Sequence, residues 1–151
     1  MTPERENGQD TPTTSELVEV LNQTVARVRA HFGAVTAQLG VTPAQAKALR
    51  YLGRPSTLSE LSGCLGSDVS NTANVVKALE AHGLLSRQPR EGDRRARTLT
   101  LTARGVRIRE QLLKRAYQSS PVFDRLSEAE RRLLHDLLLR TAKEPADDEL
   151  G

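Results

Sequence analysis

The chain has 151 residues, of which 37% are hydrophobic and only 3% aromatic, and its net charge is +3. A core of leucine, valine and alanine favours packed helices over a β-sandwich. The single cysteine, Cys64, excludes an intrachain disulfide, and no apolar run approaches the roughly 18 residues of a membrane span. The charge is unevenly distributed, because residues 86–115 carry ten Lys/Arg against three Asp/Glu. This basic segment indicates a local contact with a polyanion.

The first forty residues predict a tail followed by a long helix. Residues 1–13 are rich in Thr, Pro, Glu and Gly and predict a disordered tail. Over residues 15–39, apolar side chains recur at spacings of four and three, which is typical of an amphipathic helix. Gly40 ends this helix. The expected stripe consists of Leu17, Leu21, Val25, Val28, Phe32, Val35 and Leu39.

Capping signals predict three shorter helices. A threonine followed three residues later by Gln or Glu begins the second helix at Thr42 and the third at Thr57. Asp68 caps the fourth helix, and Gly83 closes it. We expect these helices over about residues 43–52, 58–66 and 69–82. The expected apolar face of the fourth consists of Thr72, Val75, Val76 and Leu79.

A basic hairpin and two further helices complete the pattern. Residues 84–90 and 96–101 are expected to be strands, joined by a turn over residues 91–93. Thr102 caps a fifth helix, and the Ser127–Glu130 capping box opens a final one. The expected apolar positions of the two helices are Val106, Leu112 and Leu113, then Leu133, Leu134, Leu137 and Leu138.

This order of elements predicts a mainly α chain with a small β-hairpin wing, a winged helix-turn-helix fold. We expect one domain over residues 14–144, in which the winged part covers about 42–101. The flanking helices, about 15–39 and 103–143, are expected to dimerise, because the first stripe is too long for so small a domain to cover. An acidic tail over 145–151 ends the chain.

Two motifs resemble signatures of the MarR family of bacterial regulators. Asp93-Arg94-Arg95, with the strand and Leu101-Thr102-Ala103-Arg104-Gly105 that follow, is similar to the family's wing. Leu79-Glu80-Ala81-His82-Gly83-Leu84 is similar to the exit of its recognition helix, and the order of elements agrees over roughly residues 15–143. The resemblance implies a homodimeric transcriptional repressor that binds a pseudo-palindromic operator in double-stranded DNA. It also implies release by a small anionic or phenolic ligand.

The resemblance assigns roles to the hairpin tip. It places Arg95 in the minor groove, with Asp93 as the partner that orients it. The other arginines of the hairpin suit phosphate, because guanidinium groups bind it in a bidentate fork; they include Arg90, Arg94 and Arg97. The alternative is a solvated charged hairpin, in which Asp93 is simply a turn residue.

The resemblance places the fourth helix in the major groove. The polar face of this helix presents Ser70, Asn71, Asn74 and Lys77. Asparagine can contact adenine with two hydrogen bonds, and lysine suits a phosphate. Many family members carry arginine where Asn74 stands, so the operator sequence stays open. Thr57 and Ser59 could donate to phosphate from the start of the third helix, and both also have a capping explanation.

Other functions fit the sequence less well. A winged helix used only for protein–protein contact would not need so many wing arginines, and its binding would depend weakly on salt. The sequence has no glycine-rich phosphate loop, no Ser/His/Asp grouping and no paired carboxylates, so we expect no enzyme and no cofactor. The absence of an apolar leader favours a cytoplasmic location without membrane partners.

The cysteine and the histidines carry weaker expectations. Cys64 is predicted to be a buried structural thiol and not a redox switch. His31, His82 and His135 lack the spacing of metal ligands. His31 is a candidate for contact with an effector, and an ordinary surface position is the alternative.

Overall fold

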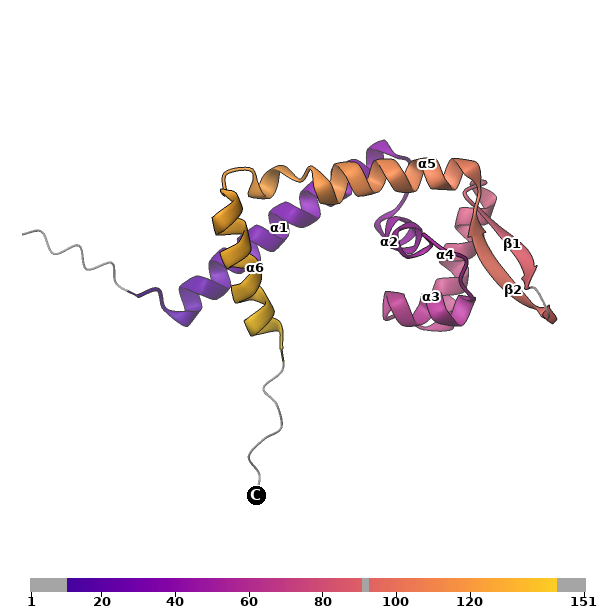
Figure 1. Cartoon of the computed structure of the whole chain (residues 1–151), viewed down its shortest axis with the longest axis horizontal. Helices are drawn as coiled ribbons and strands as arrows, with labels where there is room; N and C mark the ends of the chain where they lie inside the picture. Colours follow the sequence, from indigo (N-terminus) through magenta and orange to yellow (C-terminus); the bar gives the residue numbers. More distant parts are fainter. Residues whose placement is uncertain (1–10, 91–92, 144–151) are drawn as a thin grey trace, which may run out of the picture.

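The computed structural model describes residues 11–90 and 93–143 and shows a small head joined to a helical stalk (Figure 1). Residues 1–10 of the predicted tail over 1–13, and the predicted acidic tail over 145–151, lie outside the described part. The elements in chain order are α1 (Thr14–Gln38), α2 (Pro43–Tyr51), α3 (Leu58–Leu65), α4 (Val69–Ala81), β1 (Leu85–Arg90), β2 (Asp93–Leu101), α5 (Ala103–Leu112), the π-helical segment η1 (Leu113–Gln118), the 3-10 turn η2 (Pro121–Phe123) and α6 (Glu128–Ala142). We call α2, α3 and α4 the head, and α1, η1, η2 and α6 the stalk; the two strands form a hairpin attached to the head. Helix α5 connects the head to the stalk.

Reciprocal capping boxes begin four of the helices. The pairs are Thr13–Glu16, Thr42–Gln45, Thr57–Glu60 and Ser127–Glu130. The last three confirm the sequence prediction, and Asp68 and Thr102 cap α4 and α5 as expected. At the stalk ends, backbone and hydroxyl donors of the capping residue hold the pKa of Glu16 and of Glu130 below its usual range.

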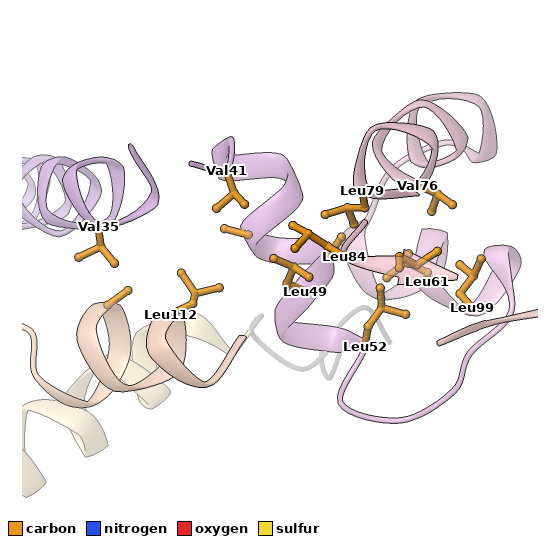
Figure 2. Packing of buried hydrophobic residues seen from close by; sticks show 14 residues of the cluster. Val35, Val41, Leu49, Leu52, Leu61, Val76, Leu79, Leu84, Leu99 and Leu112 are labelled. Carbon is orange, nitrogen blue, oxygen red and sulfur yellow. The ribbon is translucent and has the colours of Figure 1, made fainter. Parts of the chain in front are cut away.

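The buried core lies in the head and at its junction with the stalk (Figure 2). Leu49, Leu61, Leu79 and Leu99 come from three helices and one strand, and each is at most 1% exposed. Burying an aliphatic side chain of this size stabilises a fold by about 1.5–3 kcal/mol, so these leucines hold the three helices against the hairpin. The predicted apolar face of α4 is confirmed, with Thr72, Val76 and Leu79 buried and Val75 half-buried.

The two strands form an antiparallel hairpin, which we call the wing, with Leu85 opposite Leu101 and Arg87 opposite Leu99. Ser56 joins this sheet from the segment between α2 and α3. Its N–H donates to the Leu99 carbonyl at 3.1 Å, and the Leu99 N–H donates back at 2.7 Å. The pairing with Ser56 therefore fixes the base of the wing to the head along the edge of β2 that does not pair with β1.

Much of the stalk is exposed. The stripe of α1 divides in two: Leu17, Leu21, Val25 and Val28 are exposed, whereas Phe32, Val35 and Leu39 reach the core. No residue of α6 is buried, and Leu133, Leu137, Leu138 and Leu139 are at least 42% exposed. Val106, expected on the apolar face of α5, is also exposed, because Gly105 and Leu112 take the buried side of that helix.

The prediction for Cys64 was wrong, since its side chain is exposed. Helix α3 buries Leu61 and Ser62 and packs Leu58 and Leu65 against the core. At 100° per residue, Cys64 falls more than a quarter turn from the middle of that face. The small apolar residues around the cysteine suggested burial, but the direction of the helix face decides it.

Candidate nucleic-acid interface

The polar face of α4 is exposed to solvent. Ser70, Asn71, Asn74 and Lys77 are all exposed, on the side opposite the buried Thr72, Val76 and Leu79. Asp68 accepts from the Asn71 N–H at 2.8 Å, and the Asn71 side chain donates to its other oxygen. The Asn71 amide is therefore partly engaged by the cap, whereas the Asn74 amide and the Lys77 ammonium make no hydrogen bond to the described residues. Within the described part of the structure, nothing prevents these two side chains from contacting a ligand.

The wing extends from the head beside α4 (Figure 1). Arg97 is exposed on β2, opposite Pro89 of β1. The backbones of Arg90, Asp93, Arg94 and Arg95 belong to the two strands, with an irregular register between Pro89 and Arg90. Their side chains, and the turn at residues 91–92, lie outside the described part of the structure. The proposed pairing of Asp93 with Arg95 therefore stays a prediction.

The start of α3 contains the other two predicted contacts. The Thr57 hydroxyl accepts from the Glu60 N–H at 3.2 Å, and the Thr57 N–H donates to the Glu60 carboxylate at 2.7 Å. The capping explanation for Thr57 is confirmed. Ser59 is exposed in the first turn of the same helix. The phosphate role of both residues remains a prediction.

The structure shows two further arginines near the wing, Arg54 and Arg87, which were not among the predicted contact residues. Arg54 is exposed in the segment that leads to Ser56, and so brings a positive charge beside the wing. The Arg87 side chain is not free, because its Nε donates to Glu80 of α4 at 3.0 Å. The cluster of arginines in the sequence gave no sign of this pairing, since the two residues meet only after the chain turns at Gly83.

His31 lies at the junction of head and stalk and is half-buried. Its Nε2 forms a hydrogen bond of 2.9 Å with the main-chain carbonyl of Arg115 in η1. The Arg115 guanidinium in turn donates to Gln38 of α1. Contact of His31 with an effector stays a prediction. Among the described residues, no group of three His, Cys, Asp or Glu could hold a metal ion.

These features define a winged helix-turn-helix protein, with α3 and α4 joined by a tight turn and a two-stranded wing after them. A sequence model of the MarR family matches residues 39–96, from the end of α1 into β2. No curated protein matches the chain. None of the described helices has both the length and the apolar character to span a bilayer.

Solved structures extend the likeness to most of the chain. The transcriptional repressor CouR, bound to a 23-mer DNA duplex, is 26% identical, with a TM-score of 0.70 over 89% of this chain and 100% of that one. A probable transcriptional regulator from Pseudomonas aeruginosa is 28% identical, with a TM-score of 0.67 over 83% and 96%. A mutant MarR from E. coli, complexed with operator DNA, is 23% identical and shares the fold, with a TM-score of 0.69 over 84% and 94%. Residues 39–96 therefore match the MarR family, and most of the chain is similar in fold to solved transcriptional regulators.

Proposed function

We propose that the chain is a dimeric repressor that binds a pseudo-palindromic operator, with α4 in the major groove and the wing in the adjacent minor groove. The observation that carries the proposal is the exposed polar face of α4 beside an arginine-rich wing. In this arrangement Asn74 reads a base, Lys77 contacts a phosphate, and Arg95, oriented by Asp93, enters the minor groove. Ser70 and Asn71 add contacts at the start of α4.

The exposed apolar residues of the stalk support dimerisation. Large exposed apolar patches mark interaction sites, because water is expelled when they meet a complementary surface. The patch lies on α1 and α6, at the end of the molecule away from the wing (Figure 1). Its members include Leu17, Leu21, Val25, Val28, Leu133 and Leu137. A second copy bound there with two-fold symmetry would place two heads on one face of a duplex, at half-sites about 34–36 Å apart.

A matched pair of substitutions tests the dimer. Leu21→Glu places a charge on the exposed stripe, whereas Gln23→Glu adds the same side chain on the other side of α1. We expect the first variant to sediment as a monomer and the second as a dimer. A wild-type chain that is monomeric at micromolar concentration would contradict this part of the proposal.

Selection of bound fragments from a random DNA pool tests the operator. We expect a two-fold symmetric consensus and a steep loss of affinity with salt. If about eight phosphates are neutralised per dimer, a plot of the logarithm of the affinity against the logarithm of the salt concentration has a slope of roughly −7. An asymmetric or featureless pool, together with a flat salt response, would favour a protein–protein module instead.

A hollow beside η1 is the proposed binding site for a small anionic or phenolic ligand that releases the repressor from DNA. It has a volume of about 360 Å³, within the range of ligand sites. Arg131 supplies a positive charge, and the buried Ser120 hydroxyl has no hydrogen-bond partner among the described residues. The hollow is lined by Tyr117, Gln118, Ser120, Phe123, Asp124, Arg131, Leu134, His135 and Leu138. His31 does not line it.

A hydroxybenzoate tests this site, with benzyl alcohol as the uncharged control. A ligand that binds the native state raises the unfolding temperature, so we expect the acid to raise it and to weaken operator binding. Arg131→Gln should abolish both effects, whereas Arg132→Gln, at an exposed neighbour outside the hollow, should keep them. An unchanged unfolding temperature of the wild type would contradict this site for carboxylates.

A further inference from the structure

An ion pair links the proposed recognition helix to the wing. The Arg87 Nε of β1 donates to the Glu80 Oε1 of α4 at 3.0 Å, and the two side chains are 35% and 29% exposed. Arg87 lies opposite the buried Leu99 in the hairpin, so it projects from the face of the wing that meets the head. The pair therefore spans the angle between the two elements that are proposed to enter neighbouring grooves.

The main chain holds β2 through its pairing with Ser56, but on the side of β1 it fixes only the start of this angle. The Gly83 N–H donates to the Glu80 carbonyl and the Leu84 N–H to the Leu79 carbonyl, which ends α4 tightly. The Thr102 hydroxyl then donates to the Gly83 carbonyl at 2.7 Å. Arg87 lies beyond these contacts, two residues into β1. Its bond to Glu80 holds the strand where the wing begins to leave the head.

The pair also changes the charge that α4 presents. Glu80 is the only acidic residue of this helix. A carboxylate near a groove repels the flanking phosphates, and like charges brought together at an interface are costly. Arg87 cancels that charge through its Nε, and its two Nη groups, which make no hydrogen bond to another described residue, can bind a phosphate oxygen.

We propose that Glu80 and Arg87 are positioning residues, which set the angle between α4 and the wing and neutralise the helix toward DNA. The proposal rests on the proposed docking of α4 and the wing. An exposed pair adds little to stability, so its removal should change DNA binding far more than unfolding. The two single substitutions should act in opposite directions, because each leaves the other charge uncompensated.

The experiment compares affinities for the selected operator and for random duplex over a range of salt concentrations. Glu80→Gln should tighten binding to random DNA by roughly three- to tenfold and steepen the salt slope by about 1 per subunit. Arg87→Gln should weaken both affinities by roughly tenfold or more. In the double variant, random-DNA affinity should return to that of the wild type, whereas the preference for the operator should stay reduced.

Two further variants complete the design. Exchanging the charges, with Glu80→Arg and Arg87→Glu together, should restore part of the operator preference, because the link is rebuilt. Glu110→Gln, at an exposed acid on α5, is the matched charge control and should leave the preference unchanged. A double variant with full operator preference would overturn the positioning role, and single variants with unchanged salt slopes would overturn the neutralising role. A wild type that binds no DNA would end both this inference and the proposed function.

Discussion

The guanidinium carbon of Arg50 lies 4.5 Å from the centre of the Tyr117 ring, and this contact joins α2 of the head to η1 of the stalk. The same ring meets Phe32 of α1 edge-on, with the ring centres 5.8 Å apart. The Arg109 Nε of α5 donates to the Arg50 carbonyl at 3.4 Å. Arg50 and Tyr117 therefore couple the proposed DNA-reading part to the proposed dimerisation part.

Tyr117→Ala should loosen this junction. The substitution removes a cation–π contact and an aromatic pair, which together contribute about 1–2 kcal/mol to the free energy of unfolding. Tyr117→Phe keeps both contacts and should differ little from the wild type. Urea unfolding at one fixed protein concentration measures both changes. Equal losses in the two variants would assign the effect to the hydroxyl and not to the ring.

Asn74→Ala and Arg95→Ala should have different effects on DNA binding. Loss of the Asn74 amide should relax the base preference at one position of each half-site, at a cost of about 1–3 kcal/mol. Loss of Arg95 should weaken binding to most sequences and remove any preference for a narrow A/T minor groove. Binding measured against a set of single-base operator variants separates the two. If both variants bind the operator as the wild type does, the assigned DNA face is wrong.

Gly105→Ala should destabilise the fold, because the added Cβ would lie 2.0 Å from the Leu84 carbonyl oxygen. The backbone of β1 or α5 would have to move, and overpacking of this kind costs about 1–3 kcal/mol or more. Gly63→Ala is the matched control, since no atom would lie within 4 Å of the added Cβ. As an alanine inside α3, it should stabilise by up to about 1 kcal/mol. Thermal unfolding of the two variants checks both signs.

The Ser127–Glu130 capping box should lose strength in acid. The Ser127 N–H and hydroxyl both donate to the Glu130 carboxylate at 2.8 Å, which lowers the pKa of that carboxyl. Because the folded-state pKa is depressed, the stabilisation is present above the pKa of a free glutamate, about 4.3, and is lost as pH falls through the folded value.

An NMR titration of the Glu130 carboxyl measures this shift. Glu130→Gln is the control, because an amide can accept the same hydrogen bond without titrating, as Gln45 does from Thr42 at 2.9 Å. Helicity followed from about pH 6 to pH 3 should therefore change less in this variant than in the wild type. A Glu130 carboxyl that titrates at or above the ordinary value would contradict the prediction.

Local signals explain how much of the fold could be predicted. Helix starts depend on neighbours three residues apart, so the boxes at Thr42, Thr57 and Ser127 are visible in the sequence. The wing follows from a basic turn between alternating strands. The polar face of α4 also follows from helical spacing, and its four predicted side chains are all exposed.

Contacts between distant residues explain what could not be predicted. The π-helical segment η1 continues α5 without a composition that announces it, and it forms where His31 and Gln38 of α1 engage Arg115. The pairing of Glu80 with Arg87 depends on the turn at Gly83. The exposure of Cys64 depends on which side of α3 meets α4, and a short helix with small residues on several sides does not reveal that.

The division of the α1 stripe has a consequence for how the activity of the protein depends on its own abundance. Among the described stalk residues, the buried hydrophobic cluster includes only Val35 of α1 and Ala116 of η1. A single molecule therefore offers few buried contacts that would hold the outer ends of the stalk in place. If a second copy of the chain provides the missing contacts, the number of dimers depends on protein concentration by mass action. Where most copies are monomeric, halving the number of copies in a cell would remove well over half of the dimers. The proposed repression would then fade more sharply with dilution than for a protein that works alone.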